Sequence, residues 1–277
     1  MKQYLDLLEE IRFGGELRFD RTGVGTVSKF CRTMRFDLRD RFPILLSKRV
    51  NFHAVRVELA WMLQGRTDIQ FLNHHGVFIW DLWADKNGDL GPLYGSQYRH
   101  CEGKKRTVDQ LSNIVEQLKK DPHSRRHVAT TWHAPDLADM QLAPCHGTVL
   151  QFYVSGDLDD PHLSCSMYQR SADMFLGLPF NMASYAALLH IVAAMVGMKP
   201  YEFVWIGGDC HVYLNHFEAV RLQLENKDNP SVVAPERVPK LVLNHVTPET
   251  SFDEISPYRM DVVDYEPLKP IKAPIAV

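Results

Sequence analysis

The sequence predicts a single α+β domain in which helices flank a large β-sheet. Alternating apolar and polar residues gather in the middle of the chain, at 127–132, 147–154 and 163–170, and a long apolar helical pattern follows over 181–196. Strands grouped in this way are typical of α+β folds rather than of repeated βαβ units. No linker or repeat divides the 277 residues, of which 45% are hydrophobic. We therefore expect one core and one domain over 1–277.

The amino-terminal half contains two predicted helices and a strand. Apolar residues recur at helical spacing from Tyr4 to Ile11, and Gly14-Gly15 would end that helix. The segment 24–38 alternates mostly as a strand, and 55–63 has the pattern of a buried helix ended by Gly65.

The carboxyl-terminal half contains two further predicted helices around the central strands. Thr107 is placed to cap a helix with apolar residues over 111–118, which would end before Asp121-Pro122. The helix over 181–196 would end at Gly197 and is apolar on most sides, so we expect it to be buried. Cys145 falls in the loop that leads into the strand over 147–154.

Composition limits the class of protein. The net charge of −3 gives no support to a protein that wraps nucleic acid. The polar start of the chain and the lack of about 18 consecutive apolar residues predict neither a signal segment nor a membrane span. The five cysteines are scattered without a Cys-x-x-Cys pair, so we expect free thiols, no zinc site and a cytoplasmic location.

Cys145 is the strongest candidate for a nucleophile. Most free cysteines pack as small apolar residues, but Pro144 favours an extended backbone here and His146 places a polar side chain beside the sulfur. A free thiol is mostly protonated at neutral pH, so nearby arginines would be needed to stabilise the thiolate. The candidate arginines lie far apart in the sequence, at Arg21, Arg125, Arg126 and Arg170. A site that the fold assembles from them suits a small phosphate better than a polymer.

The ordered motifs of the chain resemble those of the thymidylate synthase family. The resemblance runs nearly from end to end, and an ordered set of this kind is hard to explain by chance. The motifs lie at 20–23, 48–49, 79–81, 91–95, 121–126, 143–146, 169–173, 179–181, 207–213 and 273–277.

The resemblance implies a fold, a reaction and catalytic residues. The large twisted sheet would pack against its copy in a homodimer. The Cys145 thiolate would add to C6 of deoxyuridylate (dUMP), and C5 would then attack the methylene group of 5,10-methylenetetrahydrofolate, which also supplies a hydride; no metal is implied. Glu58 would manage protons with ordered water near O4 of the pyrimidine. The implied catalytic residues are Cys145, Glu58, Tyr94, His146, Asp173 and Asn181.

The resemblance also implies a dUMP site. Arginine forks bind phosphate through paired, charge-assisted hydrogen bonds, and two of them, Arg125 and Arg126, would come from the partner subunit. Asn181 offers a donor and an acceptor to uracil. From the residues alone, Arg125-Arg126 fits a solvated corner, Asn181 a helix N-cap, and His211 with Tyr213 a polar turn. The implied positions are Arg21, Arg125, Arg126, Gln169, Arg170, Ser171, Asp173, Asn181, His211 and Tyr213.

A folate site is implied by the same family. Lys48 would attract the glutamate carboxylates, Asp173 would bond the amide edge of the pterin, and the apolar end of the chain would close over the ligand. Apolar residues at such spacing are usually core, but Trp80 and Trp83 beside acids are awkward to bury completely. The implied positions are Lys48, Ile79, Trp80, Trp83, Leu142, Asp173, Leu176, Gly177, Phe180, Ala276 and Val277.

Several alternatives stay open from the sequence. Glu58 lies among apolar neighbours, which favours a raised pKa and proton transfer, but a buried ion pair with His53 or Arg56 would also explain it. Residues 50–54 depart from the His, Arg and Ser common in the family, which alters the grip on the folate tail. A hydroxymethylase, in which water rather than hydride captures the exocyclic methylene, is therefore the alternative enzyme. An RNA-binding protein is a remoter alternative.

Overall fold

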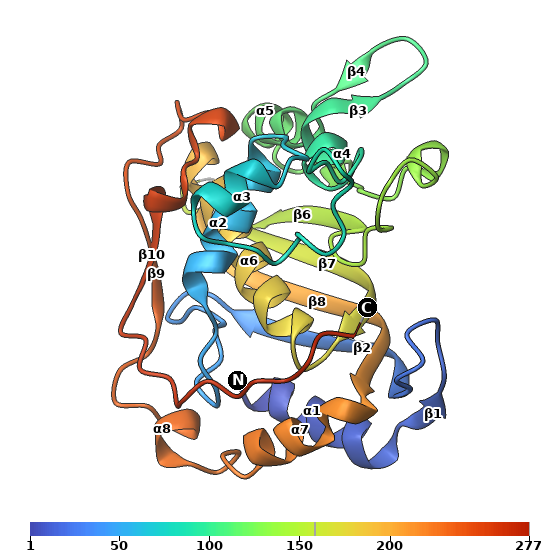
Figure 1. The fold of residues 1–277 in the computed structure, drawn as a ribbon. Helices are drawn as coiled ribbons and strands as arrows, with labels where there is room; N and C mark the ends of the chain where they lie inside the picture. The colour runs from blue at the N-terminus through green and yellow to red at the C-terminus, as the bar shows by residue number, and fades with distance from the viewer. Residues whose placement is uncertain (158, 277) are drawn as a thin grey trace.

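A mixed six-stranded sheet is the frame on which the helices pack (Figure 1). The computed structural model describes residues 1–157 and 159–276. The strand order is β1-β2-β8-β7-β6-β5, and every neighbouring pair is antiparallel except β7 and β8. The β3–β4 hairpin and a second two-stranded sheet, β9 with β10, lie outside this sheet. The strands are β1 (Glu16–Arg18), β2 (Thr26–Asp37), β3 (Cys101–Glu102), β4 (Thr107–Val108), β5 (Val128–Ala129), β6 (Val149–Ser155), β7 (His162–Asp173), β8 (Lys199–Tyr213), β9 (Lys240–Leu243) and β10 (Met260–Val263).

Helices cover the face of the sheet that carries the core. Figure 1 shows α2 and α6 in front of the long strands and α1 with α7 beside β2 and β8. The helices are α1 (Lys2–Gly14), α2 (Phe52–Leu63), α3 (Gln70–His74), α4 (Gly95–His100), α5 (Gln110–Lys120), α6 (Gly177–Val196), α7 (Phe217–Leu224) and α8 (Pro230–Val233), with short 3₁₀ turns η1 (Ala134–Asp136), η2 (Leu214–His216), η3 (Phe252–Glu254) and η4 (Pro257–Arg259).

The α6 helix is the crossover between the two parallel strands. Parallel strands cannot be joined by a tight turn, so β7 reaches β8 through this 20-residue helix, which ends at Gly197 in the left-handed conformation (φ 68°). By length and composition α6 could cross a membrane, but 78% of its most apolar window is buried inside the fold. Its apolar surface is thus used in packing. The helix also fixes the short connections from β7 to α6 and from α6 to β8.

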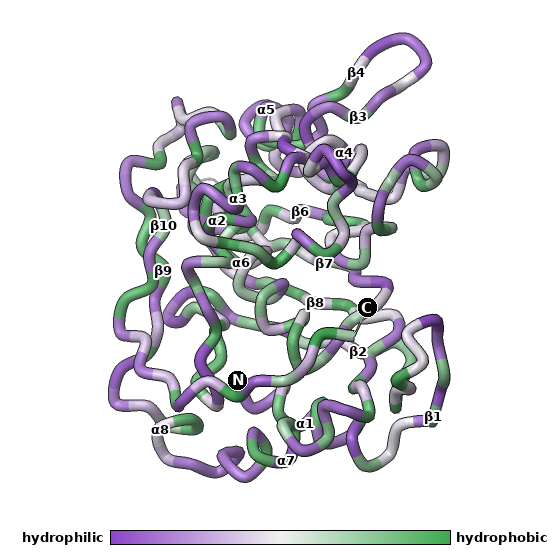
Figure 2. The backbone as a smooth tube through the Cα atoms, viewed as in Figure 1, coloured by the Kyte–Doolittle hydropathy of each residue, from purple (hydrophilic) through white to green (hydrophobic). Residues whose placement is uncertain are grey.

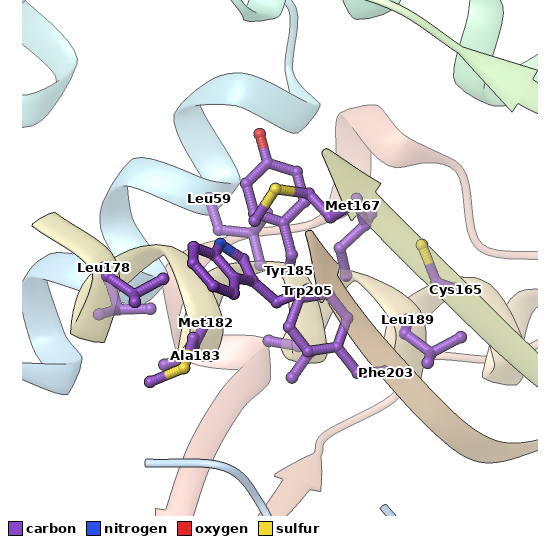
Figure 3. Packing of buried hydrophobic residues seen from close by; sticks show 14 of the residues in the cluster. Leu59, Cys165, Met167, Leu178, Met182, Ala183, Tyr185, Leu189, Phe203 and Trp205 are labelled. Carbon is purple, nitrogen blue, oxygen red and sulfur yellow. The ribbon is translucent and has the colours of Figure 1, made fainter. Parts of the chain in front are cut away.

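Apolar side chains from α2, α6, β7 and β8 form one continuous core. Leu59, Tyr185, Phe203 and Trp205 lie together in it, each at most 1% exposed (Figure 3). Figure 2 shows the contrast with the β3–β4 hairpin, which is hydrophilic along most of its length. The core therefore lies directly behind the strand ends that carry the predicted site.

The opposite face of the sheet is uncovered in the single chain. Along β6, buried Leu150 and Phe152 alternate with Val149 and Tyr153, which are 42% and 67% exposed. Val128 pairs with Gln151 and so lies on the same outer face, where it is 43% exposed. A contiguous group of exposed apolar side chains on a sheet face is typical of an interaction surface.

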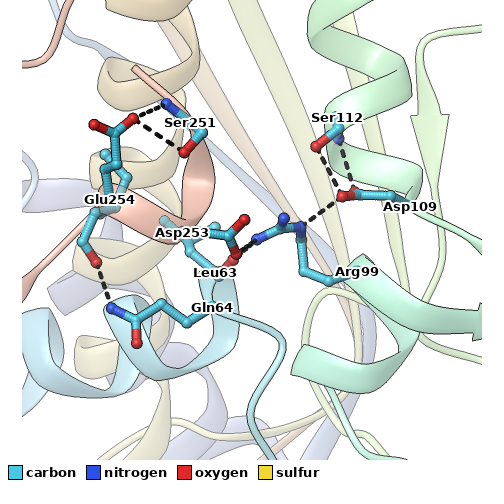
Figure 4. A network of polar contacts seen from close by, with 9 residues as sticks. Leu63, Gln64, Arg99, Asp109, Ser112, Ser251, Asp253 and Glu254 are labelled. Carbon is cyan, nitrogen blue, oxygen red and sulfur yellow. Dashed lines mark hydrogen bonds and ion pairs between the residues drawn. The ribbon is translucent and has the colours of Figure 1, made fainter.

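A polar network joins helices at one end of the molecule (Figure 4). Arg99 is only 6% exposed, donates to Asp109 at 2.9 Å and to Asp253 at 3.2 Å, and also reaches the carbonyl of Leu63. Asp109 in turn accepts from the backbone of Ser112 at 2.9 Å, which satisfies the start of α5. The network ties α2, α4 and α5 to the carboxyl-terminal region.

Most of the predicted elements are confirmed, with corrections at their ends. Asp109, not Thr107, caps α5, because Thr107 belongs to β4. The helix α6 begins at Gly177, so Asn181 lies inside it and the N-cap interpretation is wrong. The strand predicted at 127–132 is reduced to Val128–Ala129. His211 and Tyr213 end the 15-residue strand β8 rather than a turn.

Candidate active site

Cys145 lies in an irregular loop that Arg170 holds in place. The guanidinium of Arg170, on β7, donates from Nε to the carbonyl of Pro144 at 2.7 Å and from Nη2 to that of Ala143 at 2.8 Å. The loop precedes β6, as the sequence predicts. Carbonyls have no hydrogen to donate, so these two bonds fix the plane of the guanidinium beside the thiol. Arg170 thus has a structural task in addition to its charge.

Tyr94 is the closest polar partner of Cys145. Its hydroxyl oxygen accepts from the backbone N–H of Cys145 at 3.1 Å and lies 3.5 Å from Sγ. Tyr94 has a positive φ of 29°, which costs a bulky residue about 1–3 kcal/mol. Its ring is held by stacking on His146, with centroids 4.3 Å apart, and by an edge contact with Trp80. The strained backbone therefore places a hydroxyl that can donate to a thiolate.

The pKa of Cys145 reflects competing causes. Burial raises the pKa of the thiol above its ordinary value, whereas the hydrogen bond from Tyr94 and the charge of Arg170 lower it. The net direction is upward, so the arginine of one chain does not by itself make Cys145 a thiolate at neutral pH. Further positive charge near the loop would favour the thiolate.

Glu58 is buried on α2 without an ionic partner among the described residues. Its Oε1 accepts from the indole N–H of Trp80 at 2.8 Å, and it is 5% exposed. Burial raises the pKa of Glu58 to about 7, against the smaller opposing effect of that hydrogen bond. The ion-pair alternative is not supported, because His53 contacts the carbonyl of His75 and Arg56 contacts that of Met260. A carboxyl group that is half protonated near neutrality is suited to proton transfer.

A chain of hydrogen bonds assigns the tautomer of His146. Tyr98 donates to the carbonyl of Gly147 at 3.2 Å, so the hydroxyl of Tyr185 must donate to Tyr98 at 3.0 Å. The oxygen of Tyr185 then accepts from Nδ1–H of His146 at 2.9 Å, which leaves Nε2 as an acceptor. Burial lowers the pKa of His146 to about 3, so the imidazole is neutral.

The amide of Asn181 is oriented by a second chain. Trp205 can only donate, and its Nε1 donates to Oε1 of Gln169 at 3.0 Å. The amide nitrogen of Gln169 therefore donates to Oδ1 of Asn181 at 2.9 Å, and the NH₂ group of Asn181 is left free. All three side chains are at most 6% exposed. This buried series of hydrogen bonds presents the NH₂ group of Asn181 as a donor in a fixed direction.

The candidate phosphate and ribose residues lie at the edges of the sheet. Arg21 lies exposed in the turn before β2, and Arg125 with Arg126 lies exposed before β5, without ion pairs among the residues that the structure describes. At the end of β8, Nδ1 of His211 lies 3.2 Å from Oδ1 of Asp209, and its ring meets that of Tyr213 edge to face. Ser171 pairs with Asp209 across β7 and β8.

The candidate folate residues include the buried Trp80, the carboxylate of Asp173 and several partly buried apolar side chains. Trp80 is 7% exposed, so it is more completely buried than its acidic neighbours suggest, and its ring meets that of Trp83 at 5.7 Å. Asp173 lies at the end of β7, where Oδ1 accepts from the N–H groups of Phe175 and Leu176 at 2.9 and 3.1 Å. The remaining partly buried members of this group, packed against the core, are Ile79, Leu142, Leu176 and Phe180. Gly177 begins α6, Ala276 ends the described chain, and Val277 lies outside the described residues.

Lys48 is turned inward. Its ammonium donates to the carbonyl of Phe175, lies 3.5 Å from the centre of that ring and is buried, and burial lowers the pKa of Lys48 to about 7. Residues 50–53 of the neighbouring segment line an open groove of about 580 Å³ together with Arg49 and Arg56. In this conformation Arg49 is exposed at the groove and Arg56 is partly buried, whereas Lys48 faces the interior.

Comparison with known families agrees with this geometry. The family model of thymidylate synthase matches residues 2–277, which is almost the whole chain. The chain belongs to the thymidylate synthase family. Thymidylate synthase family membership implies an enzyme of one-carbon transfer that depends on folate. No cluster of metal ligands is present among the described residues.

Four residues of the candidate site were missed in the sequence. Tyr98, Tyr185 and Trp205 orient His146 and Asn181 from behind, and His216 lies behind Asp173. Tyr185 and Trp205 sit in strongly apolar helix and strand patterns, so periodicity marks them only as core. The available signal was the hydroxyl or indole N–H of a buried aromatic residue, which needs a partner.

Proposed function

We propose that the chain is a thymidylate synthase that converts dUMP to thymidylate, with 5,10-methylenetetrahydrofolate as the donor of both carbon and hydride. The observation that carries the proposal is the grouping of the Cys145 thiol with the hydroxyl of Tyr94 and the guanidinium of Arg170. In one chain this grouping joins a nucleophile to an anion-binding cation. Dihydrofolate would be the second product.

The buried acid and imidazole supply the proton transfers. Sγ of Cys145 forms a bond to C6 of dUMP, and the electron pair moves to C5 and O4. Glu58, with a pKa of about 7, can pass a proton toward O4 through water, and His146 offers Nε2 as an acceptor to that water. C5 then attacks the methylene carbon of the folate. The bond from that carbon to N10 of the folate would break as the new bond forms. Loss of the C5 proton would then expel N5 of tetrahydrofolate and leave an exocyclic methylene. Hydride transfer from C6 of tetrahydrofolate to this methylene would give the methyl group and dihydrofolate, and Cys145 would leave as thiolate.

Recognition of uracil would rest on Asn181. Its free NH₂ group can donate to O4, and the second lone pair of Oδ1 can accept from N3–H. Cytosine presents an amino group where uracil has O4, so a donor would face a donor. The buried chain through Gln169 and Trp205 prevents the amide from rotating to suit cytosine.

We further propose a homodimer formed through the uncovered face of the sheet. Val128, Val149 and Tyr153 supply apolar area there. Arg125 and Arg126 lie next to β5 at the edge of this face, where a partner's site can receive them. Their charge would then supply what the net upward pKa of Cys145 requires, and would bind the phosphate of dUMP. Five free thiols fit a reducing, cytoplasmic location.

The altered segment 50–54 supports one alternative, a dUMP hydroxymethylase. It lines an open groove, and a loosely held folate would admit water to the exocyclic methylene. That enzyme would release 5-hydroxymethyl-dUMP and tetrahydrofolate. Both activities begin with the same covalent bond to Cys145.

A stalled covalent complex tests the shared chemistry. The 5-fluoro analogue of dUMP has no C5 proton to lose, so with the folate it should remain attached to Cys145, and intact-mass spectrometry should show the combined added mass. Cys145→Ser should show no adduct, and Cys210→Ala, which changes a buried thiol outside the site, should react as the parent does. An adduct on Cys145→Ser, or none on the parent, would refute the proposal.

A further inference from the structure

His216 connects two parts of the molecule that the proposed reaction uses separately. It ends η2, directly after β8, and is fully buried. On one side its Nε2 lies 2.8 Å from the carbonyl oxygen of Pro274 in the carboxyl-terminal segment. On the other side its Nδ1 lies 3.8 Å from Oδ1 of Asp173 at the end of β7. Figure 1 shows the carboxyl-terminal segment running back across the molecule toward the strands.

The hydrogen on Nε2 follows from its partner. A carbonyl oxygen only accepts, so Nε2 carries the hydrogen and donates it to Pro274. Nδ1 has no hydrogen-bond partner among the described residues. The ring cannot turn to exchange the two nitrogens without leaving Pro274, and it is packed against the rings of Tyr213 and Phe175 at 5.4 and 5.7 Å.

The carboxyl-terminal segment has few hydrogen bonds among the described residues. Leu268 donates to the carbonyl of Leu46 at 2.9 Å, and past it the bond to His216 is the one hydrogen bond of residues 269–276 within the described structure. Ile275 is 53% exposed. Ile271 and Ala273 pack partly buried against the core, so the segment is held by this apolar contact and by a single buried hydrogen-bond donor.

We propose that His216 is a positioning residue that ties the carboxyl-terminal segment to the Asp173 side of the active site. The inference rests on the proposed function in one respect, because that function assigns Asp173 to binding the folate. Asp173 is itself pinned to the start of α6 by two backbone N–H groups, so His216 lies between a fixed carboxylate and a segment that covers the ligand. Loss of the Nε2 donor should release the segment and weaken folate retention without touching the pyrimidine contacts.

Limited proteolysis can follow the segment without any catalytic turnover. Lys272 is exposed and followed by Ala273, so trypsin can cut there, whereas the bond after Lys269 is protected by Pro270. Cleavage rate follows the population of the released segment when release is fast. The loss of residues 273–277 can be timed by intact-mass spectrometry.

Substitutions can separate the two ring nitrogens. His216→Phe keeps the shape of the ring but removes the donor. His216→Gln places an amide nitrogen near the position of Nε2, and His216→Asn places one near Nδ1. His190→Gln is the matched control, since His190 is a histidine of α6 whose Nε2 is also buried but has no hydrogen-bond partner in the described part of the chain.

The expected results follow from the loss of one hydrogen bond. His216→Phe should be cut about 3- to 10-fold faster than the parent. His216→Gln and the His190→Gln control should stay within about twofold of the parent. With the fluoro analogue of dUMP and the folate bound, cutting should slow in the parent and in His216→Gln but much less in His216→Phe. In turnover, KM for the folate should rise more than kcat falls.

Equal cutting rates of folded parent and His216→Phe without ligands would overturn the proposal. If His216→Phe does not fold, faster cutting of His216→Asn than of His216→Gln would support it, and equal rates would overturn it. If the ligands bind to no variant while the rates without ligand differ as expected, the proposed function is wrong but the tie between His216 and the segment stands.

Discussion

The amide nitrogen of Gln169 donates to Oδ1 of Asn181 at 2.9 Å, and this bond fixes which end of Asn181 faces the site. The direction is set one step further back by Trp205, whose indole nitrogen cannot accept. A residue of β8 therefore decides, through β7, what a residue of α6 offers to a base. Discrimination between uracil and cytosine should depend on both hydrogen bonds, from Trp205 to Gln169 and from Gln169 to Asn181.

Asn181→Asp should shift preference from dUMP toward deoxycytidylate. A carboxyl group accepts from the cytosine amino group and, when protonated, donates to N3. A mismatched buried polar edge costs about 1–3 kcal/mol, which is roughly tenfold or more in relative kcat/KM. Trp205→Phe only frees the Gln169 amide to rotate. It should therefore lower the ratio of kcat/KM for dUMP to that for deoxycytidylate, but by less than Asn181→Asp does. Unchanged ratios of kcat/KM in Asn181→Asp would mean that another residue reads the pyrimidine.

The sequence predicted elements better than it predicted their ends. Apolar periodicity located α1, α2, α6 and the strands β2, β6 and β7, because burial of one face sets that pattern. It placed the start of α6 at Asn181, although the helix begins at Gly177 with no side-chain cap, so no capping signal marks it. β8 was not predicted as a strand, because its two glycines and its polar residues interrupt the alternation.

The site was predicted as a set of residues rather than as an arrangement. Motifs identified Cys145, Arg170 and Asn181, but the partners that hold them come from distant core positions such as Tyr185 and Trp205. Such partners are visible only once the fold brings them together, since a buried aromatic residue in an apolar run has no local mark of a polar task. The inward turn of Lys48 toward Phe175 is likewise a tertiary effect.

Tyr94→Phe should slow thiolate chemistry while leaving the fold intact. The variant loses the hydroxyl that lies 3.5 Å from Sγ and accepts from the N–H of Cys145. Loss of a hydrogen bond to a charged group costs about 1.5–3 kcal/mol, so kcat should fall roughly 10- to 100-fold. The pH profile of Cys145 alkylation by iodoacetamide should move to higher pH. A profile identical to that of the parent would show that Tyr94 does not stabilise the thiolate.

Glu58 and His146 should make opposite contributions to the pH dependence of stability. Burial raises the pKa of Glu58 from 4.5 to about 7 and lowers that of His146 from 6.5 to about 3. Between pH 4.5 and about 7, folded Glu58 keeps a proton that the unfolded chain loses. The contribution of Glu58 to the free energy of unfolding therefore falls as pH rises through this range. Folded His146 excludes a proton that the unfolded chain takes, so its contribution falls as pH decreases from 6.5. The two slopes oppose each other between pH 4.5 and 6.5.

Glu58→Gln should expose the slope of His146. The free energy of unfolding of this variant should rise with pH across the shared window by up to about 1.4 kcal/mol per pH unit relative to the parent. Urea denaturation at several pH values measures it. The double variant Glu58→Gln with His146→Gln should lose the rise. Parallel curves for parent and Glu58→Gln would contradict the raised pKa of Glu58.

Arg126→Glu should inactivate the site of the partner rather than its own. Mixed with Cys145→Ala, it should form heterodimers with one intact site, and equal amounts should recover up to about a quarter of the parental activity, because half of the dimers are mixed and half of their sites are intact. Subunit exchange can be confirmed by native mass spectrometry with one tagged chain. Absence of recovery despite exchange would argue against a shared phosphate site.

Product identification tests the central claim most directly. Purified enzyme incubated with dUMP and 5,10-methylenetetrahydrofolate should yield thymidylate and dihydrofolate in equal amounts by mass spectrometry. Removal of Val277 or Trp80→Ala should add 5-hydroxymethyl-dUMP, because either change admits water to the exocyclic methylene. Release of 5-hydroxymethyl-dUMP and tetrahydrofolate by the intact enzyme, without dihydrofolate, would contradict the thymidylate synthase account and favour the hydroxymethylase.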